Sequence, residues 1–258
     1  MSKLSGGPKY HTKRALETIS KHSKSARDYF RSLKNNTSKN WEAQRGFENY
    51  SKVFGPFLAD FLGKNKGHVI NSRGELEHIL ASYFILKMKR KNIEVLEDGA
   101  GSGIFLTELK RLLSYSDIKI KSTALNLENN KNIEIARKNR LINEVEIGNA
   151  TKFIPKKEID LFVSLYGSIY YMFDPAAKDH FLKFAHSLKP GGLMLVGLGY
   201  KSHHSTIKQK GLLNYQMQAE QIERALEKRG FKAKFYYNPE GTAHGDPTVT
   251  LIVQKPEK

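Results

Sequence analysis

Hydrophobic and polar positions follow two different periods along residues 92–258. Short apolar runs are typical of buried strands, and longer segments with apolar residues three or four positions apart are typical of helices. Helices are predicted at Ile104–Leu113, after residue 127 up to about residue 139, at His180–Leu188 and at Ala219–Lys228. Strands are predicted at Ile93–Leu96, Ile118–Leu127, Val145–Ile147, Ile159–Leu165, Leu193–Leu198, Phe231–Tyr237 and Thr248–Gln254, the last two as an antiparallel pair. This order predicts an α/β fold with a doubly wound, mostly parallel, seven-stranded sheet.

The first ninety residues differ, because their apolar residues recur at helical spacing with many basic residues between them. Three helical segments are predicted, at residues 15–33, 47–62 and 75–89. Gly55-Pro56 predicts an interruption of the second helical segment. The chain therefore divides into a basic helical N-terminal extension, residues 1–74, and an α/β domain, residues 75–258. We expect residues from about Tyr29 to Phe61 to form a lid over the carboxyl ends of the fourth and fifth strands, close to Tyr166 and Tyr170. The alternative is that they pack on the outer helices of the sheet and only stabilise the domain.

Composition limits the function classes. The chain has no cysteine, which excludes disulfides, thiolate metal sites and cysteine nucleophiles. No apolar run reaches the roughly 18 residues that a membrane-spanning helix needs, and residues 1–7 do not resemble a secretory signal. We therefore predict a cytoplasmic protein without a transmembrane segment. Its net charge is +17, and residues 1–91 contain 19 basic and 7 acidic side chains. Such a charge attracts RNA or an anionic surface, although lysine-rich faces also serve solubility.

The segment with the clearest chemistry is Val95-Leu96-Glu97-Asp98-Gly99-Ala100-Gly101-Ser102-Gly103. A strand that ends in an acid, then three alternate glycines and a helix, is a nucleotide-binding turn, in which bare backbone lets a ligand approach closely. A nicotinamide or flavin fingerprint would place glycine where Ile104 stands. A phosphate-binding loop would end in Gly-Lys-Ser/Thr, which is absent.

Three further segments occur in the order expected of one family. Lys189-Pro190-Gly191-Gly192-Leu193 precedes the fifth strand, Gly148-Asn149-Ala150 follows the third, and Asp160–Gly167 contains the fourth. Together with the glycine turn, they resemble the motifs of class I S-adenosylmethionine-dependent methyltransferases. The resemblance covers about residues 75–258 and implies a Rossmann-like fold. It also implies S-adenosyl-L-methionine as cofactor and S-adenosyl-L-homocysteine as product.

The resemblance implies a role for individual residues. Glu97 would face the amino group of the methionine moiety. The acid that usually binds the ribose is replaced by Asn126, so either Asn126 or Glu128 would take that role, since both lie on one side of the strand. Asn149 replaces the acid beside the adenine amine, and its amide oxygen can accept the same bond. The residues expected at the cofactor are Glu97, Gly99, Ala100, Gly101, Gly103, Asn126, Leu127, Glu128, Asn149, Ala150 and Leu165.

Catalysis of methyl transfer requires mainly alignment of an acceptor and the exclusion of water. Tyr166, Tyr170 and His203 follow the fourth and fifth strands, at the edge where ligands bind, and are the candidate catalytic residues. No metal site is expected. We predict transfer to an oxygen or nitrogen atom of a small-molecule acceptor. Two alternatives remain open: a methyltransferase that acts on RNA or another polyanion held by the basic N-terminal region, and a cofactor-binding protein without catalysis.

Overall fold

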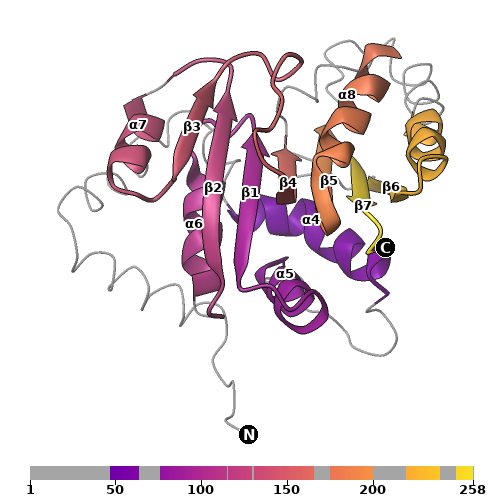
Figure 1. Ribbon diagram of the computed structural model, residues 1–258, viewed down its shortest axis with the longest axis horizontal. Coiled ribbons are helices and arrows are strands. Elements are labelled where there is room, and N and C mark those ends of the chain that lie inside the picture. The colour runs from indigo at the N-terminus through magenta and orange to yellow at the C-terminus, as the bar shows by residue number, and fades with distance from the viewer. Residues whose placement is uncertain are drawn as a thin grey trace, which may run out of the picture.

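The computed structural model describes residues 47–63, 76–114, 116–129, 131–165, 175–199, 219–238 and 248–257. Within these ranges the chain forms one seven-stranded sheet in the order β3-β2-β1-β4-β5-β7-β6 (Figure 1). Its strands are β1 (Asn92–Asp98), β2 (Lys119–Asn126), β3 (Glu144–Ile147), β4 (Ile159–Leu165), β5 (Leu188–Gly199), β6 (Lys232–Asn238) and β7 (Thr248–Gln254). The first five are parallel, and β7 pairs antiparallel with both β5 and β6. The predicted α/β sheet is confirmed.

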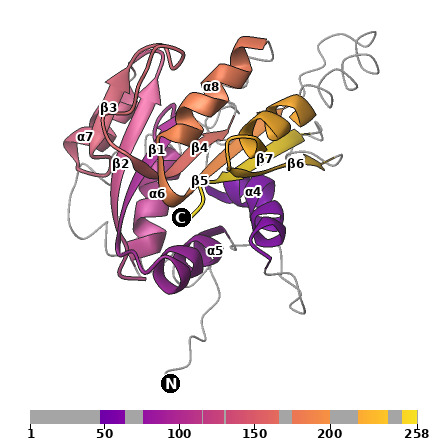
Figure 2. The ribbon, with the colours of Figure 1, turned by 45° about the vertical axis from the view of Figure 1, so that its right-hand side comes forward.

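Helices cover both faces of the sheet. Among the described residues, the helices are α4 (Phe47–Phe61), α5 (Leu76–Ser82) with its π-helical continuation η1 (Tyr83–Lys87), α6 (Ile104–Ser114), α7 (Lys131–Lys138), α8 (Pro175–His186) and a helical segment over residues 219–227. One apolar core lies between the sheet and α4, α5, α6 and α7, and a second lies beneath α8 and residues 219–227. Figure 2 shows α8 on one side of β4 and β5 and α4 on the other. The fold is therefore doubly wound, as predicted.

Strand β4 is central, and all seven of its residues are buried. A strand covered on both faces reads as a continuous apolar run, which is why the sequence located it accurately. Strand β5 begins at Leu188 rather than at the predicted Leu193. Its pairing with β4 shifts register between Ile159 and Leu161, which accommodates the Pro-Gly-Gly segment inside the strand.

Helix α4 runs without a break through Pro56, so the predicted interruption at Gly55-Pro56 is wrong. Pro56 is exposed, and the gap that it leaves in the hydrogen-bond ladder of the helix therefore faces solvent. The helix lies on the face of the sheet, against β5 and β7 and beside α5 and α6. Val53 and Phe54 contact the position of Gly197 in β5. Tyr166 and Tyr170, the predicted neighbours of a lid, lie outside the described residues, as do residues 1–46.

The amino-terminal edge of the sheet is held by a buried carboxylate. Asp160 has no solvent exposure and accepts bonds from the Arg90 guanidinium and the Lys189 ammonium, each at 2.6 Å. It also accepts a bond of 2.7 Å from the backbone N–H of Glu94. A buried carboxylate must be paired and hydrogen-bonded to offset its desolvation. Asp160 thus joins β1, β4 and the start of β5 at the edge opposite the glycine turn.

We expect Asp160→Asn to lower the free energy of unfolding by about 2–4 kcal/mol, because it leaves two cations without their shared partner. This loss is smaller than that for fully buried ion pairs, since the Arg90 and Lys189 side chains are partly exposed. Urea denaturation measures the loss. The matched control is Glu134→Gln, which breaks the surface pair with Arg137 and should cost less than about 1 kcal/mol. Equal losses in the two variants would contradict this account of the edge.

Candidate functional site

The glycine turn lies at the carboxyl end of β1, between that strand and the first turn of α6. Gly99, Gly101 and Gly103 all have positive φ angles, of 71°, 56° and 74°. This region of backbone space strains any residue with a Cβ atom, so the alternate glycines are required by the path of the chain. The N–H of Gly99 donates to the carbonyl of Leu125 at 2.8 Å and ties the turn to β2.

Asn126 fixes the centre of this turn. Its Oδ1 accepts from the N–H of Gly101, and its Nδ2 donates to the carbonyl of Gly101, both at 2.8 Å. The side chain is buried, and both of its hydrogen-bonding groups serve the backbone of one residue, Gly101. An aspartate could not make the second bond, because an ionised carboxylate only accepts. The amide that looked like a departure from the family's acid therefore has a local structural reason.

Glu97 lies on the face of the sheet that α4 covers. Its carboxylate is fully buried, and its Oε1 accepts a short hydrogen bond from the hydroxyl of Tyr50. Tyr50 is also fully buried, and its ring stacks on Phe105 with 4.0 Å between centroids. In the sequence, Tyr50 is one of the apolar positions of the helical segment at residues 47–62, and helical spacing cannot tell which of these side chains meets a polar partner.

Asp98 lies on the opposite face, because successive residues of a strand alternate. It is buried and accepts a bond of 3.1 Å from the hydroxyl of Ser164, at the end of β4. From α8, the Lys183 ammonium donates to the carbonyls of Ala150 and Thr151, each at 2.9 Å. Burial lowers the pKa of Lys183, and the nearby charge of Asp98 opposes that change. Lys183 therefore holds the loop after β3 against α8.

His180, one turn before Lys183 on α8, is also buried and makes an edge contact with the ring of Phe184. Burial, with a smaller contribution from the Lys183 charge, lowers the pKa of His180 to about 4. The His180 imidazole is therefore neutral near pH 7. In that form it packs on the Phe184 ring without repelling the Lys183 ammonium.

The structure brings most of the predicted cofactor residues to one edge of the sheet. Glu97 lies near the end of β1, and the glycines follow that strand. Asn126 is the last residue of β2, and Leu127 and Glu128 follow it. Asn149 and Ala150 follow β3. Leu127 is 72% exposed although it is apolar, and Glu128 and Asn149 are exposed as well. Ala150 and Leu165 are buried. Tyr166, Tyr170 and His203, the predicted catalytic residues, lie outside the described residues.

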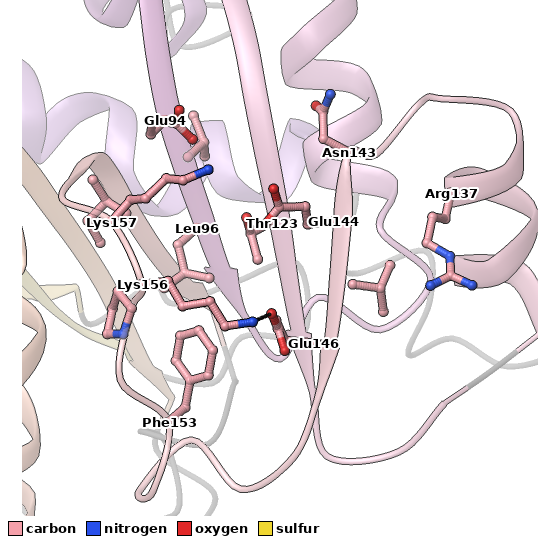
Figure 3. Close-up of a pocket in the computed structure, with 14 residues that line it drawn as sticks. Glu94, Leu96, Thr123, Arg137, Asn143, Glu144, Glu146, Phe153, Lys156 and Lys157 are labelled. Carbon is pink, nitrogen blue, oxygen red and sulfur yellow. Dashed lines mark hydrogen bonds and ion pairs between the residues drawn. The ribbon is translucent and has the colours of Figure 1, made fainter.

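A cavity of about 470 Å³ lies elsewhere, on the face of β1, β2 and β3 below this edge (Figure 3). Its lining includes Glu94, Thr123, Glu144 and Phe153, and the Lys156–Glu146 ion pair of 2.8 Å crosses it. None of the glycines of the turn lines it. In the part of the chain that the structure describes, no group of three His, Asp or Glu residues could hold a metal ion. No helix in that part is long and apolar enough to span a membrane.

Comparison with solved structures gives a likeness of fold. A protein proposed to be a sarcosine dimethylglycine methyltransferase from Galdieria sulphuraria superposes with a TM-score of 0.50 at 16% identity, over 71% of this chain and 85% of that one. This chain shares its Rossmann-like fold. The N-methyltransferase NodS from Bradyrhizobium japonicum, in complex with S-adenosyl-L-homocysteine, gives a TM-score of 0.47 at 15% identity, over 80% and 100% of the chains. No family model and no curated protein matches the sequence.

The two asparagines of the site give a direct test of this geometry. We expect Asn126→Asp to lower the free energy of unfolding by about 1–3 kcal/mol, because a carboxylate oxygen then faces the carbonyl of Gly101. Asn149→Asp is the matched control. Its exposed Oδ1 accepts from the N–H of Thr151 at 2.9 Å, a bond that a carboxylate can also make. Urea denaturation compares the two. A stable Asn126→Asp protein would contradict the assigned role of the amide.

Proposed function

We propose that this protein is a methyltransferase that binds S-adenosyl-L-methionine on the glycine turn at residues 99–103 and transfers its methyl group to a small molecule. The observation that carries the proposal is the buried carboxylate of Glu97 beside three glycines of positive φ, at the carboxyl end of β1. In open α/β sheets, ligands bind outside the carboxyl ends of the strands. The shared fold supports this position.

The residues present fit the cofactor. Glu97 supplies negative charge for the ammonium of the methionine moiety, and the bare backbone of Gly99 and Gly101 leaves room for close approach. Asn126 is occupied with Gly101, so we assign the ribose hydroxyls to the exposed Glu128. Leu127 offers an apolar surface for adenine, and burial of that surface by a ligand would explain its 72% exposure. The remaining contacts are assigned to Ala100, Gly103, Asn149, Ala150 and Leu165.

The cofactor, when bound, supplies a methyl group already activated by a sulfonium. The protein then has to align the acceptor atom, exclude water and remove a proton where the acceptor carries one. We assign these tasks to Tyr166, Tyr170 and His203, which follow β4 and β5 in the chain. The proposed acceptor atom is an oxygen or a nitrogen. The Galdieria protein is named for sarcosine and dimethylglycine, so small amines are the first acceptors to test.

The proposal extends to the surroundings of the site. Residues 1–74 are proposed as a basic extension of the domain at 75–258, with the lid role limited to residues 1–46, because α4 packs in the core of the sheet. A cytoplasmic location is proposed from the absence of cysteine. An RNA or anionic partner rests on the +17 charge alone and stays a prediction.

Calorimetry with S-adenosyl-L-methionine and S-adenosyl-L-homocysteine tests the site. We expect wild-type dissociation constants in the low-micromolar range or weaker, and no measurable binding to Gly101→Val, because a β-branched side chain would enter the ligand's path. Gly230→Val is the matched control. Gly230 has a φ angle of +83° and no atom near the position of a Cβ, so its substitution imposes similar backbone strain far from the site. Unchanged affinity in Gly101→Val would refute the site.

Turnover separates an enzyme from a cofactor-binding protein. The wild-type protein, incubated with methyl-labelled cofactor and a panel of small amines and hydroxyl compounds, should transfer label to at least one of them and release S-adenosyl-L-homocysteine. Binding without transfer to any member of a broad panel, RNA included, would favour the non-catalytic alternative.

A further inference from the structure

The contact between Tyr50 and Glu97 joins an N-terminal helix to the site. Tyr50 and Glu97 are 47 residues apart in sequence, and both side chains have no solvent exposure. The hydroxyl of Tyr50 donates to Oε1 of Glu97. A hydrogen bond to a charged group in a dry environment is stronger than one at the surface, and its loss leaves a buried acceptor unsatisfied. The orientation of the carboxylate therefore depends on where α4 places Tyr50.

Aromatic contacts fix the ring of Tyr50. It stacks on Phe105, the second residue of α6, with 14° between the ring planes. Phe54, one turn along α4, meets it edge-on at 5.9 Å. Phe47 stacks on the same Phe105 ring, and its N–H donates to Oε2 of Glu108 at 2.7 Å. The first turn of α4 is thus docked onto the helix that begins at the glycine turn.

The rest of α4 is anchored to the far strands of the sheet. The carbonyl of Val53 accepts from the hydroxyl of Thr250 on β7 at 3.4 Å. Near the end of the helix, Asp60 accepts bonds from Lys234 and Tyr236 on β6, at 3.1 and 3.0 Å. Contacts at both ends leave α4 little freedom to slide along the sheet. Tyr50 is consequently held in place by strands on the opposite side of the molecule from β2 and β3 (Figure 1).

From these contacts we infer that Tyr50 is a positioning residue for the cofactor: it holds the Glu97 carboxylate in the orientation that receives the ammonium group of the methionine moiety. The inference rests on the proposed function. It assigns α4, which precedes the glycine-turn domain in the sequence, a part in cofactor recognition. Tyr50 acts through Glu97 and not by contact with the ligand, so its effect is limited to ligands that carry the ammonium.

The test compares two ligands on the full-length protein. One is S-adenosyl-L-homocysteine, and the other is its deamino analogue, in which a hydrogen replaces the α-ammonium group. In Tyr50→Phe we expect the dissociation constant of the first to rise about tenfold or more, and that of the analogue to stay within about twofold of wild type. Isothermal titration calorimetry measures both. A merely structural role of Tyr50 would weaken the two ligands alike, and that result would overturn the inference.

Tyr83→Phe is the matched control for folding. Tyr83 is 1% exposed, donates to the carbonyl of Gly191 at 2.6 Å and accepts from Gln254 at the opposite edge of the sheet. Loss of the Tyr83 hydroxyl should lower the free energy of unfolding about as much as loss of the Tyr50 hydroxyl does. It should leave the dissociation constants of both ligands unchanged. If Tyr83→Phe weakens S-adenosyl-L-homocysteine as strongly as Tyr50→Phe does, the effect of Tyr50 is a general loss of folding and the inference is wrong.

A double variant tests whether Tyr50 acts through Glu97. In a Glu97→Gln background, Tyr50→Phe should weaken S-adenosyl-L-homocysteine by less than about twofold, because residues that act as a unit are not additive. Fully additive losses would mean that Tyr50 contacts the ligand itself, against the inference. If the wild-type protein binds neither ligand, the proposed function itself is refuted. That result is distinct from every outcome expected of the variants.

Discussion

The paired hydrogen bonds between the Asn126 side chain and the backbone N–H and C=O of Gly101 are the constraint on which the site depends. A turn with three positive φ angles has little intrinsic preference for one shape, and here the end of β2 imposes that shape through a buried amide. Once the turn is fixed, α6 begins at Ile104, directly after Gly103. Glu97 and Asp98 end β1 just before the turn, and both are buried. An amide side chain is required at this position because the backbone of Gly101 presents both a donor, its N–H, and an acceptor, its C=O.

Strand alternation separates the two adjacent acids into different environments. Glu97 meets Tyr50 in the core beneath α4, whereas Asp98 meets Ser164 beneath α8, where Lys183 also holds the loop after β3. Each face of the sheet thus connects the end of β1 to a different helix. The cavity on β1, β2 and β3 is lined by neither acid and by none of the glycines of the turn. It is therefore separate from the proposed cofactor site.

The sequence predicted the sheet well because β4 and its neighbours are buried on both faces and read as short apolar runs between turn residues. It also located the glycine turn, because three alternate glycines between a strand and a helix supply the positive φ angles that the turn adopts. Prediction from the sequence failed where contacts between segments far apart in the chain determine the local structure. Helix α4 continues through Pro56 because the lost bond faces solvent, and Asn126 turns to Gly101, a residue 25 positions earlier. No local pattern shows that Tyr50 reaches Glu97, because that contact depends on the packing of α4 across the sheet.

Hydrogen–deuterium exchange with and without S-adenosyl-L-homocysteine tests the central claim most directly, because it locates the ligand without any substitution. The account predicts slower exchange in peptides that cover residues 97–103 and 125–128, which contain the glycine turn and the end of β2. It predicts unchanged exchange in residues 143–146 and 153–157, which line the cavity on the sheet face. Protection of the cavity segments with none at the glycine turn would contradict the account.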